Sequence, residues 1–210
     1  MMDLFASPTA ERILAPGAVV LGGMARDEGL LAALDRVVQA APFRHMVTPG
    51  GRAMSVAMSN CGALGWVTDR RGYRYTTHDP TSDAPWPAMP VEFRALAVRA
   101  ATQAGFAKFE PDACLINRYA PGARMALHQD RNELDFAAPI VSVSLGLAAM
   151  FLWGGVERGD RPQRVPLLHG DVVVWGGPAR LNFHGVAPLA EGEHAVLGRQ
   201  RINLTFRKAA

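Results

Sequence analysis

The segment Arg201-Ile202-Asn203-Leu204-Thr205-Phe206-Arg207 decides the fold class. Its polar and apolar residues alternate with a period of two, which is the period of a β-strand with one buried face. The polar face carries Arg201, Asn203, Thr205 and Arg207. We expect the apolar face to pack against outer helices and the polar face to point into a barrel, where arginines are costly unless an anion pairs with them. A solvated polar face is the alternative.

Other strand-like segments precede this one. They are short, are bounded by glycine or proline, and cover residues 114–119, 141–146, 149–153, 163–168, 172–175 and 180–186. Such a series indicates a β-sandwich or barrel. Two segments with helical periodicity, 27–41 and 90–105, predict helices packed outside it. The chain therefore reads as mostly β with flanking helices.

Composition is typical of one globular domain. The chain has 210 residues, of which 49% are hydrophobic and 20% are charged, enough to bury a substantial core. We predict one compact domain in two parts, 1–89 (an N-terminal extension, a helix and a lid) and 90–210 (a helix and the β core). We see no membrane-spanning segment or secretory signal and expect a cytoplasmic location. Cys61 and Cys114 are too few for a disulfide framework and are expected to be reduced.

A metal site is suggested by His128 and Asp130, which are two residues apart. An extended chain places both side chains on one face. With His184 they would supply two imidazoles and one carboxylate and leave the opposite face of the ion open, as in non-haem Fe(II) oxygenases. The triplet His-x-Asp alone is weak, and a polar turn beside a strand is the alternative.

Two further segments could bind ligands. Leu115, Asn117 and Tyr119 share a face, so an amide and a phenol could bond a carboxylate. Residues 66–77 interleave aromatic residues with arginines, a pattern that could hold unpaired bases. A β-hairpin that turns at Gly72, with its aromatic residues in the core, is the alternative. The net charge of +3 is too small to prove a nucleic-acid partner.

These motifs together resemble the AlkB family of iron- and 2-oxoglutarate-dependent dioxygenases, which repair alkylated bases. The matching blocks are 47–51, 54–58, 111–122, 127–130, 139–147, 169–177 and 203–207. The resemblance implies a double-stranded β-helix, also called a jelly-roll or cupin-like fold, with an N-terminal nucleotide-recognition lid. It also implies Fe(II), 2-oxoglutarate as co-substrate, and O₂.

The resemblance assigns roles to particular residues. The iron ligands and catalytic residues would be His128, Asp130 and His184. The 2-oxoglutarate site would comprise Asn117, Tyr119, Arg201, Asn203 and Arg207, with Arg207 at the distal carboxylate and Arg201 at the end near the metal. The substrate contacts would be Thr48, Met58, Trp66, Tyr73, Leu115, Asn132, Glu133 and Arg158. His128 would also stack on the flipped base opposite Trp66, and Asn132 replaces an aspartate found in the family.

The implied activity is oxidative dealkylation of N-alkylated bases, such as 1-methyladenine and 3-methylcytosine, in single-stranded DNA, with release of an aldehyde, succinate and CO₂. RNA, and duplex DNA by base flipping, are further candidate substrates. A monomer without a membrane partner is expected. One alternative is a 2-oxoglutarate oxygenase that hydroxylates a small molecule or a protein side chain. Another is a non-catalytic metal-binding β-barrel module.

Overall fold

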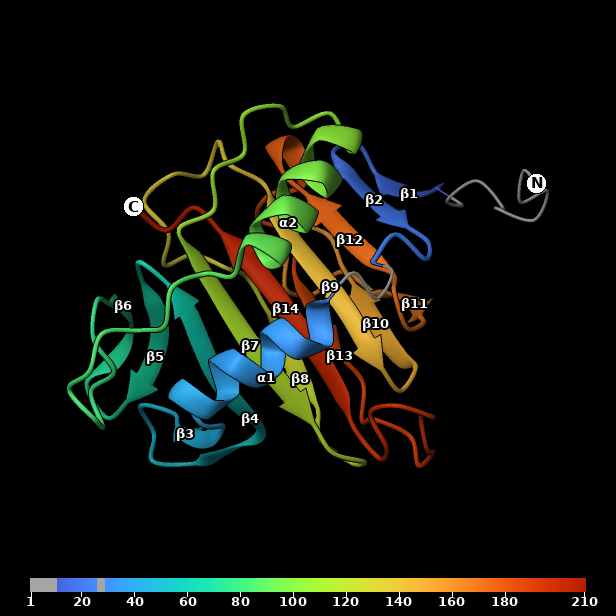
Figure 1. Cartoon of the computed structure of the whole chain (residues 1–210). Helices are drawn as coiled ribbons and strands as arrows, with labels where there is room; N and C mark the ends of the chain where they lie inside the picture. The colour runs from blue at the N-terminus through green and yellow to red at the C-terminus, as the bar shows by residue number, and fades with distance from the viewer. Residues whose placement is uncertain (1–10, 26–28) are drawn as a thin grey trace, which may run out of the picture.

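A computed structural model describes residues 11–25 and 29–210 (Figure 1). Most strands form two antiparallel sheets. The larger sheet has the order β1 (Glu11–Ala15), β2 (Ala18–Leu21), β12 (Val172–Trp175), β9 (Ile140–Gly146), β14 (Arg201–Arg207), β7 (Ala113–Tyr119), β4 (Ala53–Gly62), β3 (Arg44–Val47). The smaller sheet has the order β11 (Gln163–Leu167), β10 (Ala149–Trp153), β13 (His184–Val186), β8 (Met125–His128). A separate hairpin consists of β5 (Gly65–Asp69) and β6 (Gly72–Thr76).

This arrangement confirms the predicted mostly β, jelly-roll fold with flanking helices. An apolar cluster fills the space between the sheets, with Val173 and Trp175 from the larger sheet and Phe151 and Trp153 from the smaller one. Part of the predicted N-terminal extension, residues 1–10, lies outside the described residues. The division at residue 89 stays a prediction.

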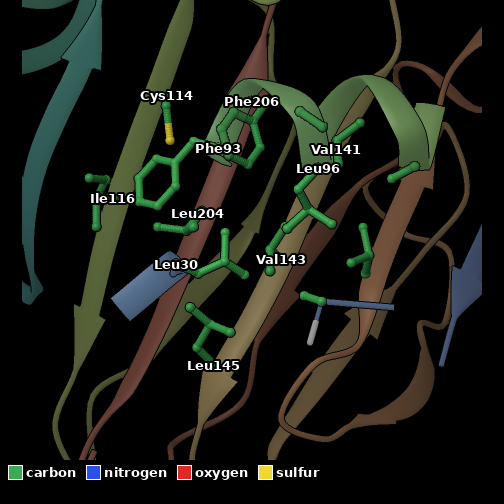
Figure 2. Packing of buried hydrophobic residues seen from close by; sticks show 14 of the residues in the cluster. Leu30, Phe93, Leu96, Cys114, Ile116, Val141, Val143, Leu145, Leu204 and Phe206 are labelled. Atoms are coloured by element: carbon green, nitrogen blue, oxygen red, sulfur yellow. The ribbon is translucent and has the colours of Figure 1, made fainter. Parts of the chain in front are cut away.

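Strand β14 has the bounds that its alternation predicts. It pairs with β7 on one side and β9 on the other, and all seven of its residues are buried. Its apolar side chains face the helices, and Figure 2 shows Leu204 and Phe206 beside Phe93. The rings of Phe93 and Phe206 meet edge to face at 6.0 Å. Burying each such side chain contributes about 1.5 to 3 kcal/mol to stability.

Both predicted helices are present and cover one face of the larger sheet (Figure 1). α1 (Leu30–Ala40) stops before Pro42, while the predicted start at residue 27 lies outside the described residues. α2 (Val91–Gln103) follows Pro90 and stops before Gly105, whose φ of 88° suits a residue just past a helix. No helix in the described part of the chain is long and apolar enough to cross a membrane. Cys61 and Cys114 are free and buried.

The predicted strand 180–186 is wrong at its start. Only His184–Val186 pairs as a strand, and a 3₁₀ turn, Gly177–Ala179, precedes it. The side chains of Arg180 and Asn182 instead turn inward and donate to the backbone carbonyls of Asp130 and Gly154. The polar side chains of this segment therefore hydrogen-bond to backbone carbonyls elsewhere, and residues 180–183 do not pair as a β-strand. Strands β1, β2 and β3 had no sequence prediction.

Candidate metal and co-substrate site

The predicted metal ligands come together at the end of the smaller sheet. His128 ends β8, His184 begins β13, and the two residues face each other across the antiparallel pair. Asp130 lies just beyond the end of β8, so the predicted strand does not extend to it. Its Oδ1 lies 3.7 Å from Nε2 of His128, and its Oδ2 lies 3.8 Å from Nε2 of His184. One donor atom from each residue lies within 4.8 Å of the others.

The chemical state of these donors suits a divalent cation. Nδ1 of His128 lies 2.9 Å from the carbonyl of Ala126, and Nδ1 of His184 lies 3.0 Å from that of Asn182. A carbonyl can only accept, so each Nδ1 carries the proton and each Nε2 keeps its lone pair for a metal. Two imidazoles and one carboxylate are the ligand set that non-haem Fe(II) sites use.

Electrostatics keep the ligands in their metal-binding forms. Burial, followed by the nearby His128, lowers the pKa of His184 to about 4, so this ring is neutral at physiological pH. Burial alone would raise the pKa of Asp130, but the charge of Arg207 and its hydrogen bonds to the carboxylate outweigh burial and hold this pKa well below its ordinary value. Asp130 is therefore ionised.

Next to the triad, the polar face of β14 lines a pocket between the sheets. The pocket is lined by Leu115, Asn117, Tyr119, Arg201, Asn203, Thr205 and Arg207, together with His128 and His184. Asn203 faces Asn117 across the β14–β7 pair, and Arg201 faces Tyr119. The period-two pattern therefore predicted correctly which side chains point inward.

Arg201 is a buried cation with unused donors. Its Nη2 donates to Oγ of Ser144 at 2.9 Å, but Nε and Nη1 are buried without a hydrogen-bond partner among the described residues. Oδ1 of Asn117 is likewise buried without a hydrogen-bond partner among the described residues. Burial raises the pKa of Tyr119, so its phenol stays protonated. A buried guanidinium with two free donors is costly unless an anion binds it, and a carboxylate meets that need.

Arg207 lies at the metal end of the pocket, which corrects the predicted order of the two arginines. Its Nε and Nη2 donate to Oδ2 of Asp130 at 2.9 and 2.7 Å. Arg201, at the other end of β14, lies away from that carboxylate. The strand pattern alone could not reveal which end faces the metal, because Asp130 is placed by the β8–β13 pairing.

The segment 66–77 is a hairpin, as one of its two interpretations predicted, but its aromatic residues are not all in the core. The rings of Trp66 and Tyr73 stack at 5.6 Å, and Tyr73 is 49% exposed. Nε1 of Trp66 donates to Oδ1 of Asn132 at 3.2 Å. The exposed residues Arg70 and Arg71 form the turn. The hairpin thus presents a stacked aromatic pair beside the loop that follows Asp130.

Other predicted substrate residues lie at varied distances from the triad. Glu133 is buried and bonds Tyr75 and Arg180. Met58 is buried opposite Asn117 across the β4–β7 pair. Thr48 accepts from the backbone N–H of Arg52 within a turn.

Arg158 is exposed, and its guanidinium lies 5.1 Å from the Phe183 ring. Among the described residues, neither Thr48 nor Arg158 forms a hydrogen bond or ion pair with the triad. The sequence pattern assigned no role to Tyr75 or Arg180. Tyr75 could have been found from its spacing, because it lies two residues after Tyr73 and so on the same face of a strand.

Comparisons with known proteins agree with this geometry. Residues 17–207 match the model of the 2OG-Fe(II) oxygenase superfamily. The chain is 57% identical to the alpha-ketoglutarate-dependent dioxygenase AlkB of Salmonella typhimurium, over 100% of this chain and 99% of that protein. It is 33% identical to the human nucleic acid dioxygenase ALKBH1, over 62% of this chain and 34% of that protein.

The structure also resembles that of OsALKBH1, with a TM-score of 0.82 and 28% identity over 95% of this chain and 100% of that one. The fold, the ligand set and the similarity in sequence all point to the same chemistry. The chain therefore belongs to the 2OG-Fe(II) oxygenase superfamily and, within it, to the AlkB alpha-ketoglutarate-dependent dioxygenases, which use Fe(II), 2-oxoglutarate and O₂.

Proposed function

We propose that this dioxygenase removes alkyl groups from ring nitrogens of nucleic-acid bases, such as 1-methyladenine and 3-methylcytosine. The proposed substrate is single-stranded DNA, with RNA and flipped-out bases of duplex DNA as further substrates. The products are an aldehyde, succinate, CO₂ and the restored base. The observation that carries the proposal is the Trp66–Tyr73 stack, bonded through Asn132 to the loop that follows Asp130.

Each part of the site has a separate task. His128, Asp130 and His184 would hold Fe(II). Arg201, Asn117 and Tyr119 would bind one carboxylate of 2-oxoglutarate, with Asn203 beside them, and Arg207 would face the carboxylate near the metal. When bound, Fe(II) and 2-oxoglutarate supply the O₂ chemistry that hydroxylates the alkyl carbon. The protein orients that carbon and excludes water. The hydroxylated carbon then separates from the ring nitrogen as an aldehyde.

Access to the pocket requires an unpaired or flipped base, because a base inside a duplex cannot reach a buried metal. Flipping costs a few kcal/mol. Stacking on an aromatic ring returns about 1 to 3 kcal/mol per base, and Trp66 and Tyr73 offer such rings. The human relative is named a nucleic acid dioxygenase, which supports a nucleic-acid substrate. We further propose a cytoplasmic monomer, in which residues 1–89 comprise an N-terminal extension, a helix and the lid.

Mass spectrometry of methylated oligonucleotides tests the proposal. DNA and RNA strands that carry 1-methyladenine or 3-methylcytosine are incubated with the protein, Fe(II), ascorbate and 2-oxoglutarate, and succinate is measured in parallel. We expect the methyl group to be lost and about one succinate to form per base restored. Succinate formation without any base repair would favour an oxygenase that acts on a small molecule or a protein side chain. Absence of both would favour a non-catalytic metal-binding module.

A further inference from the structure

Glu133 is a buried carboxylate that joins segments far apart in the sequence. Its Oε1 accepts a hydrogen bond from the phenol of Tyr75 at 2.6 Å and lies 3.5 Å from Nε of Arg207. Its Oε2 accepts from Nη2 of Arg180 at 3.1 Å. The side chain is only 2% exposed, so solvent does not screen these contacts. Glu133 therefore fixes the positions of three side chains at once.

On the metal side, Glu133 belongs to a closed set of four buried charges. Arg207 lies between Glu133 and Asp130, and Arg180 bonds both the carboxylate of Glu133 and the backbone carbonyl of Asp130. The cations Arg180 and Arg207 alternate with the anions Asp130 and Glu133, so the set is neutral. Removing one member would leave an uncompensated buried charge. A shift of Arg207 would directly change the positive charge next to Glu133.

On the hairpin side, Glu133 bonds the lid that carries the aromatic stack. Tyr75 lies on β6 and faces Trp66 across the β5–β6 pair. Trp66 bonds Asn132 and Tyr75 bonds Glu133, so the hairpin is held at two successive residues of one loop. The contact with Glu133 is the shorter and involves a carboxylate, which makes it the stronger of the two. Burial raises the pKa of Tyr75, so the phenol stays protonated as the donor.

We propose that Glu133 is a positioning residue that couples occupancy of the 2-oxoglutarate site to the hairpin β5–β6. The inference rests on the proposed function, because it takes Arg207 as part of the co-substrate site and the hairpin as the nucleotide lid. A carboxylate that approaches Arg207 competes with Glu133 for the guanidinium. Oε1 of Glu133 then keeps Tyr75 as its main partner and binds the phenol more strongly. The hairpin is therefore more ordered with 2-oxoglutarate than without it.

Hydrogen exchange of the full chain loaded with Mn(II), which allows binding to be followed apart from turnover, tests the proposal. We expect 2-oxoglutarate to slow amide exchange in residues 65–76. Tyr75→Phe removes only the hydroxyl that Glu133 accepts from. It should bind 2-oxoglutarate within about twofold of the wild-type affinity, while the slowing in the hairpin disappears. Tyr73→Phe is the matched control, because it removes a hydroxyl from the same hairpin that forms no hydrogen bond to Glu133 among the described residues, and it should keep the slowing.

Kinetics separate positioning from a purely structural role. Tyr75→Phe should raise KM for the oligonucleotide about tenfold, the effect of one hydrogen bond to a charged group, and leave KM for 2-oxoglutarate unchanged. Glu133→Gln should also raise KM for the oligonucleotide, because a neutral amide binds the phenol of Tyr75 more weakly. It should lower KM for 2-oxoglutarate, because it removes the carboxylate that competes for Arg207.

Three results would overturn the inference. The first is an unchanged hairpin at saturating 2-oxoglutarate, and the second is a Tyr75→Phe protein that retains the wild-type slowing. The third is a wild-type protein that shows no saturable 2-oxoglutarate binding, which would remove the proposed function as well. Because binding and exchange are measured separately, this third failure is distinguishable from the first two.

Discussion

Arg207 donates two hydrogen bonds, from Nε and Nη2, to the same oxygen of Asp130, at 2.9 and 2.7 Å. Oδ2 of Asp130 also lies 3.8 Å from Nε2 of His184. The guanidinium therefore orients the carboxylate that we expect to bind the metal. Arg207 is also the residue of the polar face of β14 that contacts a metal ligand, so it joins the metal site to the face where the co-substrate would bind.

We expect Arg207→Lys to weaken metal binding. Lysine keeps the charge but cannot donate two hydrogen bonds in a fixed geometry. Loss of a residue that orients a metal ligand typically costs 10- to 100-fold in metal affinity or activity. Titration of Mn(II) into the protein measures the affinity directly. Unchanged Mn(II) affinity would show that Asp130 does not need Arg207 for its orientation.

The depressed pKa of His184 predicts acid sensitivity. The folded state holds this imidazole neutral down to about pH 4, whereas an unfolded histidine takes up a proton near pH 6.5. Between these values the unfolded state binds more protons, so the free energy of unfolding decreases as the pH falls. If the whole pKa shift is expressed, the free energy of unfolding decreases by about 3 kcal/mol.

Urea unfolding of the metal-free protein at pH 7 and pH 4.5 tests this expectation. His184→Gln removes the titrating group and should reduce the loss of stability between the two pH values. His45→Gln, at an exposed position, is the control and should behave as wild type. The idea fails if His184→Gln loses as much stability as the wild-type protein.

Trp66→Ala should separate substrate handling from the chemistry at the metal. The indole stacks on Tyr73 and bonds Asn132, but it is not one of the three candidate ligands. Loss of one stacking partner costs about 1 to 3 kcal/mol, so KM for the oligonucleotide should rise roughly 5- to 150-fold. Succinate formation without nucleic acid should stay near the wild-type rate. Equal losses in both assays would contradict this division of tasks.

Asn132→Asp should increase the preference for cationic bases. Oδ1 of Asn132 already accepts from Trp66, and an aspartate could keep that bond while adding a negative charge. Both 1-methyladenine and 3-methylcytosine carry a positive charge. Two opposite charges near 4 Å attract by about 1 kcal/mol in water, so kcat/KM for these bases should rise about fivefold. A neutral methylated base serves as the control, and an equal rise for it would rule out an electrostatic cause.

The core of the fold could be predicted from the sequence because it depends on local alternation. Strand β14 and the inward direction of Arg201 and Arg207 followed from a period of two. The ligand set followed from the His-x-Asp spacing and a distant histidine. The sequence did not predict which of the two arginines lies near the metal ligands, because only the β8–β13 pairing determines where Asp130 lies.

Contacts between segments distant in the sequence explain what was missed. Arg180 resembled the start of a strand, yet its guanidinium is buried against Glu133 and the backbone of Asp130. Tyr75 fitted an ordinary hairpin position, yet its phenol reaches a residue 58 positions away. Neither contact leaves a periodic signal in the sequence, because each depends on the packing of the hairpin and the 3₁₀ turn against the same loop.

Anaerobic calorimetric titration with Fe(II), followed by 2-oxoglutarate, measures whether the triad binds iron and the β14 pocket binds the co-substrate. We expect one Fe(II) per chain and saturable binding of 2-oxoglutarate. His184→Ala should lose Fe(II) binding, and Arg201→Ala should lose the co-substrate while keeping the metal. His45→Ala should change neither. Wild-type affinity for Fe(II) in His184→Ala, or wild-type affinity for 2-oxoglutarate in Arg201→Ala, would contradict the account.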